Sequence, residues 1–335
     1  MDRAPSISNI ESASKTVARL VQETACWHAS KLSEMYGCNV FLKREDRQKV
    51  RSYKIRGAFN KICRMVESGC EGPVVCASAG NHAQGVAYSC SELGVRGVIF
   101  MPVTTPAQKI DAVRYFGKDN VDIRLVGDCF DESASEALAY SAANGMVFVP
   151  PFDDPDIIAG QATVAVELLA QMKERGVVPD IVFVPIGGGG LASGVGLYLK
   201  SASPSTRVIG VEPAGAASMK AAIAAGGPVT LDSMDTFVDG AAVRRVGDLT
   251  YGICSRVLDD IVVVPEGAVC TEMLGMYNRS GIVLEPAGAL TVTALRFCGD
   301  MTADRNVCCI LSGSNNDIAR IDEIRRRSEE FENNQ

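Results

Sequence analysis

Lys54 is the residue whose type and setting most clearly suggest chemistry. It follows Tyr53 and begins a predicted helix over residues 54–67. The N-terminus of a helix disfavours a positive charge, and a buried amine has a lowered pKa and reacts more readily as a nucleophile. The segment therefore predicts an activated lysine, although residue types alone leave Lys54 as one lysine among several.

Four consecutive glycines, Gly187 to Gly190, form a second signal. They lie between an apolar run over residues 181–186 and a helical pattern over residues 191–200. Glycine permits close backbone approach, and the N-terminus of the following helix offers free N–H groups to an anion. The spacing fits neither a nucleotide P-loop nor the dinucleotide fingerprint. A tight turn without a ligand is the alternative, but four glycines in a row favour a phosphate site.

A polar loop, Ser78-Ala79-Gly80-Asn81-His82, forms a third signal between a strand-like run and a helical pattern. The Asn81 amide can donate and accept, and the neighbouring N–H groups can bind a carboxylate. Ordinary helix capping explains this loop equally well when it is taken alone. Together, an amine, a phosphate site and an amide-bearing loop can hold a phosphorylated aldehyde as a Schiff base, as pyridoxal-phosphate enzymes do.

The elements that must position these loops alternate along the chain. Continuous apolar strands separated by helices indicate parallel sheets covered on both faces, and thus an α/β protein. Strands are predicted at residues 40–43, 74–77, 97–101, 122–126, 146–149, 181–185, 208–212, 261–264 and 307–311. Helices are predicted at residues 54–67, 84–93, 106–116, 131–143, 156–173, 191–200, 267–278, 287–297 and 317–327.

A proline-rich segment, residues 150–155, divides the chain. The block before it, residues 67–149, is predicted to form a small, mobile, inserted domain with its own sheet. Residues 1–66 and 150–335 are predicted to form the large cofactor-binding domain. We therefore expect two open, mostly parallel, twisted sheets flanked by helices.

Composition and charge exclude several classes of function. The chain has 335 residues and a net charge of −7, so nucleic acid and anionic membranes are poor partners. No apolar stretch reaches the roughly 18 residues that span a bilayer, and the first five residues lack a secretory pattern. The twelve cysteines form no Cys-x-x-Cys pair, and several lie in apolar runs. We expect buried thiols, no metal site and a cytoplasmic location.

Three further expectations concern polar segments. The charge-rich run over residues 43–49 is expected to be mostly a solvated face. His28, which follows Trp27, is expected in an amphipathic helix. The last residues, 325–335, are polar and are expected to form a frayed tail.

Seven ordered motifs resemble the PLP-dependent threonine dehydratases (threonine ammonia-lyases), which have the tryptophan-synthase-β-like fold. The resemblance runs from about residue 32 to residue 327. The motifs are LKRED at 42–46, SYKIRGA at 52–58, ASAGNHAQG at 77–85, GGGG at 187–190, FVDGAAV at 237–243, EPAGA at 285–289 and LSGSNN at 311–316.

The resemblance implies a role for each matching residue. Lys54 would carry pyridoxal 5'-phosphate as a Schiff base and remove the Cα proton, and Ser78 is the second catalytic residue it implies. Asn81 would bind the 3′-oxygen of the cofactor, and Ser312 would face its pyridine nitrogen. The substrate carboxylate would lie among Ser78, Ala79, Gly80, Asn81 and His82. The other cofactor contacts would come from Tyr53, Gly187, Gly188, Gly189, Gly190, Leu191, Gly240 and Glu285.

These roles imply β-elimination of L-threonine, and of L-serine, to a 2-oxo acid and ammonia in a homodimer or homotetramer. A serine at the pyridine nitrogen would make the ring a weaker electron sink than a carboxylate partner would, which favours prompt elimination. Biosynthetic relatives, which serve isoleucine formation, continue into a regulatory domain beyond a region like residues 321–328. Inhibition by isoleucine is therefore not expected here.

Two departures bear on the alternatives. Ala79 stands where serine racemases resembling this family have a serine that acts as a second base, so racemisation should be poor. In racemase-like members a second acidic residue follows the position of Glu212 and helps to bind a divalent cation. No such residue follows Glu212 at positions 214–218. The alternatives are a serine racemase/dehydratase, a 3-hydroxyaspartate ammonia-lyase, a β-replacement synthase, and a cofactor-binding protein without turnover. A panel of hydroxy amino acids, scored for oxo-acid release, distinguishes them.

Overall fold

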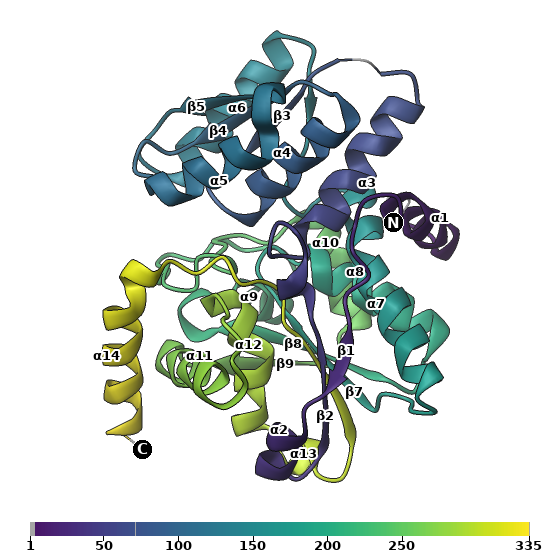
Figure 1. Ribbon diagram of the computed structural model, residues 1–335, viewed down its shortest axis with the longest axis vertical. Coiled ribbons are helices and arrows are strands. Elements are labelled where there is room, and N and C mark those ends of the chain that lie inside the picture. The colour runs from purple at the N-terminus through teal and green to yellow at the C-terminus, as the bar shows by residue number, and fades with distance from the viewer. Residues whose placement is uncertain (1–3, 71, 335) are drawn as a thin grey trace.

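The computed structural model describes residues 4–70 and 72–334, and it consists of two lobes stacked along the long axis (Figure 1). Each lobe is built on one sheet with helices on both of its faces. The start of the chain, on which the expectation about a secretory signal depends, lies partly outside the described residues. The predicted α/β class with two mostly parallel sheets is confirmed, whereas the division at residues 67 and 149 stays a prediction.

The larger sheet carries six strands in the order β1-β2-β10-β7-β8-β9. All neighbours are parallel except β1, which runs antiparallel to β2. The strands are β1 (Cys26–His28), β2 (Asn39–Lys43), β7 (Ile181–Pro185), β8 (Arg207–Pro213), β9 (Asp260–Val264) and β10 (Asn306–Ile310).

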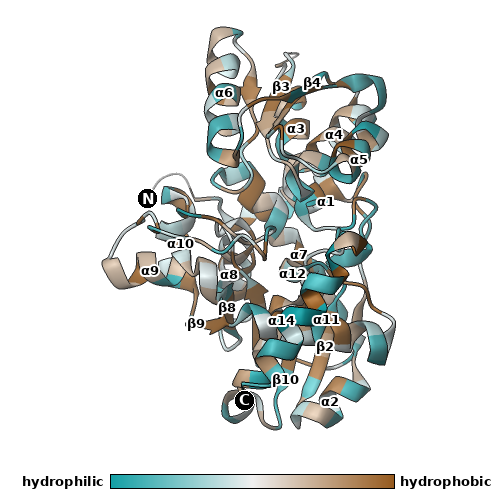
Figure 2. Cartoon of the chain, turned by 90° about the vertical axis from the view of Figure 1, so that its left-hand side faces the viewer, coloured by the Kyte–Doolittle hydropathy of each residue, from teal (hydrophilic) through white to brown (hydrophobic). Residues whose placement is uncertain are grey.

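The smaller sheet has four parallel strands in the order β5-β4-β3-β6. Its strands are β3 (Val74–Ala77), β4 (Gly97–Met101), β5 (Val121–Leu125) and β6 (Val147–Phe148). Every residue of β3 and β4 is buried, as expected when helices cover both faces. Strands β3, β8 and β9 accordingly carry the hydrophobic colour in Figure 2.

The core of the larger lobe lies on both faces of its sheet because side chains alternate along each strand. In β7, Ile181 and Phe183 pack into one apolar cluster, and Val182 and Val184 pack into the other. A strand buried on both faces reads as a continuous apolar run, which is why the sequence predicts β7 with the correct bounds.

Each predicted helix overlaps an observed one, and α3 begins and ends at the predicted residues. The helices are α1 (Ile7–Val17), α2 (Ser30–Tyr36), α3 (Lys54–Glu67), α4 (Asn81–Leu93), α5 (Ala107–Gly117), α6 (Phe130–Ala143), α7 (Pro155–Glu174), α8 (Gly190–Ala202), α9 (Ser218–Ala225), α10 (Asp248–Val257), α11 (Glu266–Ser280), α12 (Pro286–Ala294), α13 (Gly299–Thr302) and α14 (Ile321–Glu332).

Two local expectations are wrong. His28 lies in strand β1 rather than in a helix, because Trp27 pairs with Leu42 of β2. The polar end of the chain continues as α14 to Glu332 instead of fraying. Its apolar side packs on α11, where Phe331 lies so close to Gly267 that a Cβ there would be 2.5 Å away.

The charge-rich run is also not solvated at its start. Lys43, Arg44, Glu45 and Asp46 are all buried, with exposed fractions between 0% and 5%. Lys43 and Glu45 are met by Glu167 and Arg56 from other elements, which no local pattern reveals, while Arg44 and Asp46 pair with each other. Buried charges persist in a fold when they are paired in this way.

The described residues agree with the expectation about cysteines. Ten of the twelve thiols are buried, and all twelve are free. Within residues 4–70 and 72–334, no helix is long and apolar enough to cross a membrane. In the same ranges, no group of three His, Cys, Asp or Glu side chains is arranged to hold a metal ion.

Candidate active site

The Lys54 amine lies at the first turn of α3, between the two lobes. Its Nζ donates a hydrogen bond to the carbonyl of Pro151 at 2.8 Å and lies 5.5 Å from the centre of the Tyr53 ring. Burial lowers the pKa of the amine to about 8, while the negative charge of Glu285 acts in the opposite direction. A substantial fraction of this lysine is therefore neutral near physiological pH.

Ser312 is brought beside Lys54 by pairing between two loops. The Tyr53 N–H donates to the Ser312 carbonyl at 3.1 Å, and Ser52 forms an antiparallel bridge with Gly313. Arg51 takes a left-handed φ of 57°, which turns the chain into this pairing. The buried Ser312 hydroxyl donates to the Ala287 carbonyl at 3.2 Å. The loops thus fix the distance between the predicted lysine and the predicted serine.

Asn81, Gly240 and Glu285, each predicted to contact the cofactor, lie together in the structure. Asn81 begins α4, and its Nδ2 donates to Glu285 Oε1 at 2.7 Å. Its Oδ1 accepts from Asn315 Nδ2 at 2.6 Å. A Cβ at Gly240 would lie 3.8 Å from Glu285 Oε1. Burial first, and the charge of Asp239 second, raise the pKa of Glu285 to about 7.

The raised pKa of Glu285 predicts a pH effect on stability. Since the folded-state pKa exceeds the ordinary 4.5, the contribution of this group is full below pH 4.5 and is lost as pH rises through 7. Glu285→Gln should therefore gain stability relative to the parent by about 2–3 kcal/mol between pH 5 and pH 8. Urea unfolding of the cofactor-free proteins measures this difference, and a difference that is constant with pH contradicts it.

The loop of the predicted carboxylate site precedes α4. The Gly80 N–H donates to Ser78 Oγ at 3.2 Å, and Ala79 lies between these residues. The His82 ring turns away, because its Nε2 donates to the carbonyl of Val149 at 2.9 Å. Burial, followed by the charge of Lys54, lowers the pKa of His82 to about 3. His82 can therefore contribute to the predicted carboxylate site only through its backbone N–H.

The glycine loop leaves no room for side chains. A Cβ at Gly188 would lie 2.2 Å from the Phe152 ring, and a Cβ at Gly187 would lie 3.0 Å from the Ala241 backbone. Gly189 has a φ of +92° and caps α8 without any side chain. The loop can therefore present only backbone groups at this helix end.

The orientation of this loop suits an anion. Thr250 Oγ1 donates to the Gly188 carbonyl at 2.7 Å, so that carbonyl has a hydrogen-bond donor within the protein. The first backbone bond of α8 runs from the Ser193 N–H to the Gly189 carbonyl. The N–H groups before it, including that of Leu191, have no intrahelical partner. A phosphate group fits such a helix N-terminus, and with the lysine amine nearby the site fits pyridoxal phosphate.

Sequence reasoning missed four contributors to this site. Phe152 and Thr250 shape the glycine loop, Pro151 accepts the Lys54 hydrogen bond, and Asn315 holds Asn81. Pro151 and Phe152 lie in the segment that the proline pattern marks only as a crossing between domains. The sequence around Thr250 does not mark it as a site residue, because its hydroxyl bonds to Gly188 in a distant segment.

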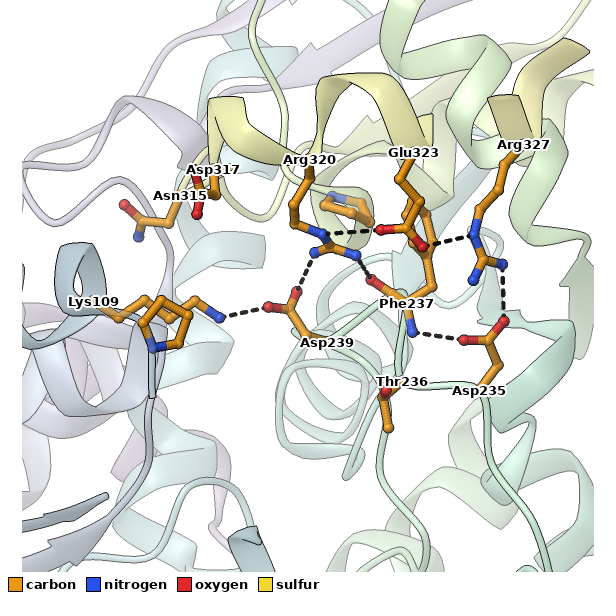
Figure 3. Close-up of a pocket in the computed structure, with 12 residues that line it drawn as sticks. Lys109, Asp235, Thr236, Phe237, Asp239, Asn315, Asp317, Arg320, Glu323 and Arg327 are labelled. Carbon is orange, nitrogen blue, oxygen red and sulfur yellow. Dashed lines mark hydrogen bonds and ion pairs between the residues drawn. The ribbon is translucent and has the colours of Figure 1, made fainter. Parts of the chain in front are cut away.

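A charged cavity opens beside the site, with a volume of about 340 Å³ (Figure 3). Asn315 and Pro286 line it, and they adjoin the network of Asn81 and Glu285. Lys109 of the smaller lobe reaches across it to Asp239 at 2.6 Å. The cavity is therefore an opening between the lobes that suits small polar or charged molecules.

Glu212, the remaining residue of a possible cation site, has other partners. Its carboxylate accepts from the N–H groups of Met219 and Lys220 at 2.7 and 2.9 Å. Burial raises the pKa of Glu212 to about 7, against the effect of these bonds. The N-terminus of α9 thus satisfies this carboxylate.

Comparisons with known proteins identify the family of the chain and its cofactor. The family model described as pyridoxal-phosphate dependent enzyme matches residues 17–313. The biosynthetic L-threonine dehydratase IlvA of Halalkalibacterium halodurans is 51% identical over 322 residues, which cover 96% of this chain and 77% of that protein. The processed threonine deaminase isoform 2 of Solanum lycopersicum superposes with a TM-score of 0.89 at 36% identity, over 98% of this chain and 96% of that one. Maize serine racemase superposes with a TM-score of 0.88 at 31% identity, over 98% and 99%. The chain therefore belongs to the threonine dehydratase branch of the pyridoxal-phosphate dependent enzymes.

Proposed function

We propose that this protein is a pyridoxal-phosphate-dependent ammonia-lyase that converts L-threonine, and also L-serine, to a 2-oxo acid and ammonia. The observation that carries the proposal is the Lys54 amine, with a pKa of about 8, set beside Ser312 and near a glycine loop that fits phosphate. The close relatives are named for threonine dehydration, which supports the same reaction.

Different residues of the chain carry out different parts of this reaction. When bound, pyridoxal phosphate supplies electron withdrawal from the Cα carbon of the amino acid attached to it. Lys54 would hold the cofactor through its amine and, once the amino group of the substrate has displaced that amine, would take the proton from Cα. The backbone N–H groups at the start of α8 bind the phosphate, and the loop from Ser78 to His82 binds the substrate carboxylate.

The partner of the pyridine nitrogen influences the outcome. Ser312 would place a neutral hydroxyl at this nitrogen of the bound cofactor, whereas a carboxylate would favour a protonated ring. The weaker electron withdrawal would favour prompt loss of the β-hydroxyl, which, with the proton that Lys54 takes from Cα, makes up one molecule of water. Hydrolysis in solution then returns one water and releases ammonia, so L-threonine yields 2-oxobutanoate.

The proposed activity is tested with the purified, cofactor-loaded enzyme. Incubation with L-threonine should release 2-oxobutanoate and ammonia in equal amounts, and L-serine should release pyruvate. No oxo acid from either substrate at full cofactor occupancy refutes the proposal. Adding L-3-hydroxyaspartate and an activated serine with sulfide to the same panel reveals a different lyase or a β-replacement synthase.

Ala79 predicts the stereochemistry. Its methyl group cannot donate or accept a proton, so L-serine should give pyruvate without D-serine. A well-placed acid–base group contributes about 10²–10⁴-fold, so Ala79→Ser should raise D-serine formation by at least about 10²-fold. Chiral chromatography of the reaction mixture measures this. Racemisation by the parent enzyme itself contradicts the assignment.

We infer a small amino acid as the substrate, because the similar relatives are named for threonine dehydration. A homodimer or homotetramer and a cytoplasmic location remain predictions, and the free buried cysteines support the second. Light scattering at several protein concentrations tests the first.

A further inference from the structure

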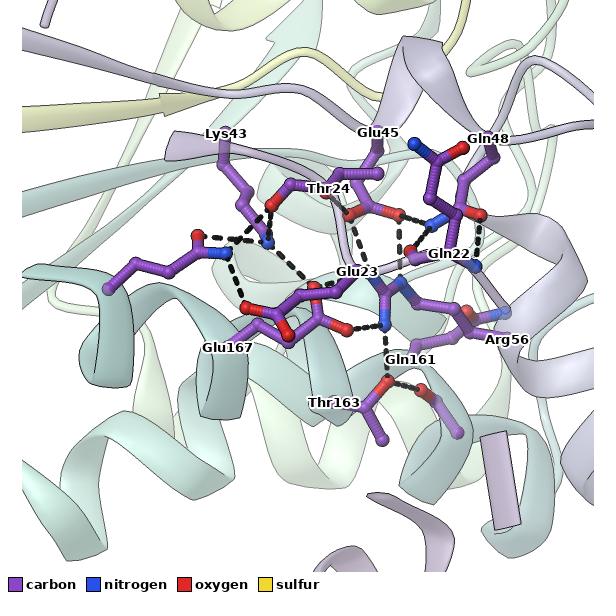
Figure 4. A network of polar contacts seen from close by, with 12 residues as sticks. Gln22, Glu23, Thr24, Lys43, Glu45, Gln48, Arg56, Gln161, Thr163 and Glu167 are labelled. Atoms are coloured by element: carbon purple, nitrogen blue, oxygen red, sulfur yellow. Dashed lines mark hydrogen bonds and ion pairs between the residues drawn. The ribbon is translucent and has the colours of Figure 1, made fainter. Parts of the chain in front are cut away.

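Arg56 lies two residues after Lys54 on α3, and its side chain is completely buried. Its Nε and Nη2 donate to the two carboxylate oxygens of Glu45, at 2.8 Å each. Its Nη1 and Nη2 donate to Glu167 at 2.7 Å each, and Nη1 also donates to Thr163 Oγ1 at 3.0 Å. All five N–H groups of the guanidinium thus have an acceptor, so one orientation is fixed (Figure 4).

The partners of Arg56 belong to one closed network. Glu45 follows strand β2 and accepts from the Thr24 hydroxyl as well. Glu167 on α7 also accepts from Lys43 Nζ, at 2.7 Å, and Lys43 donates to the Thr24 carbonyl at 2.6 Å. The two positive charges of this network, on Lys43 and Arg56, balance the two negative charges on its glutamates. It therefore joins the end of β2 to α3 and α7 through directional bonds.

Helices α3 and α7 touch through their backbones next to Arg56. A Cβ at Gly160 would lie 2.6 Å from the Arg56 carbonyl and 2.6 Å from Gly57 Cα. A Cβ at Gly57 would lie 2.9 Å from the Ile157 carbonyl. The two glycines set how closely the helices approach, and the bonds from Arg56 to Glu167 set their position along each other.

This crossing controls where the Lys54 amine lies. Residues two apart in a helix are about 200° apart around its axis, so Lys54 and Arg56 are on nearly opposite sides of α3. Lys54 Nζ bonds to the carbonyl of Pro151, just before α7 begins at Pro155. A shift of α3 against α7 therefore displaces the amine from its partner.

We propose that Arg56 is a positioning residue for the reaction, which holds the first turn of α3 through Glu45 and Glu167 so that Lys54 faces the reacting carbon. The inference rests on the proposed function, because it needs Lys54 to be the base. Stability alone gives little reason for such a network, since apolar side chains of similar volume often replace a buried ion pair without loss. Arg56 acts only through Lys54.

Arg56→Lys tests the proposal, because it keeps the charge but offers three donors in place of five. A displacement of about 1 Å can cost on the order of 10²-fold, so kcat for L-threonine should fall by about 10- to 100-fold with KM unchanged. In the cofactor-free proteins, peptide mapping measures how far Lys54 is acylated at each pH. The pH of half-maximal acylation should be higher in Arg56→Lys than in the parent. Arg326→Lys, in an exposed pair with Glu330, is the matched control and should change neither quantity.

Repeating the substitution in the Lys54→Ala variant distinguishes a positioning role of Arg56 from a general loss of structure. Lys54→Ala rescued by methylamine lacks the tethered amine, so Arg56→Lys should then change the rescued rate by less than about 2-fold. An equal loss in both backgrounds overturns the inference. If Arg56→Lys does not fold, Glu167→Gln replaces it, and the same two outcomes decide. Full activity of Lys54→Ala without methylamine refutes the assignment of Lys54 as the base, whereas the absence of oxo acid from the cofactor-loaded parent enzyme is the different result that refutes the proposed function.

Discussion

Lys54→Ala is expected to lower kcat/KM for L-threonine by at least about 10³-fold, because it removes both the covalent attachment of the cofactor and the base at Cα. The variant should still fold, since the amine makes one hydrogen bond, to the carbonyl of Pro151. Methylamine in solution should restore part of the activity. Oxo-acid release, measured with and without the added amine, checks the result.

The control for this variant is a lysine of the same type in another setting. Lys15→Ala, at an exposed position of α1, should retain the activity of the parent. The pH dependence adds a second check, because only the neutral amine can attach the cofactor. Since the pKa of Lys54 is about 8, the rate of attachment should rise about tenfold per pH unit below 8 and level off above it. Full activity of Lys54→Ala without methylamine contradicts the assignment.

Gly188→Ala is expected to weaken pyridoxal phosphate binding by about 10- to 100-fold, since an overpacked methyl group costs about 1–3 kcal/mol. Its Cβ would lie 2.2 Å from the Phe152 ring, so the loop must move away from the position that presents its N–H groups. Titration of the cofactor-free protein, followed by absorbance, measures the dissociation constant.

Two further variants make this prediction specific. Phe152→Ala in the Gly188→Ala background should recover much of the affinity, because it removes the ring atoms, Cγ included, that the methyl group meets. Gly252→Ala, in the middle of α10 where no atom lies within 4 Å of the added Cβ, should bind the cofactor like the parent. Unchanged affinity in Gly188→Ala means that the glycine loop does not hold the phosphate.

Much of the fold can be predicted from the sequence because its signals are local. Strand β7 is a continuous apolar run, and α3 begins where Tyr53 and Lys54 change the pattern, so both have the predicted bounds. Strand β1 was missed because its three residues form a strand only by pairing with β2.

The candidate site can likewise be predicted only in part from the sequence. Lys54, Ser312 and the glycine loop carry their own motifs, and the structure places Lys54 and Ser312 on paired loops. Phe152 could not be found, since its contact with Gly188 joins segments that are distant along the chain. The buried state of Lys43 and Glu45 could not be found either, because their charges are matched by Arg56 and Glu167, on other elements.

The proposed function requires that the amine of Lys54 carries the cofactor. Borohydride reduction of the loaded enzyme makes the attachment permanent, and peptide mass mapping then locates the added pyridoxyl phosphate group. We expect one modified peptide, with the added mass on Lys54 and none on Lys43 or Lys61. Modification of another lysine, or no modification in protein saturated with pyridoxal phosphate, would contradict it.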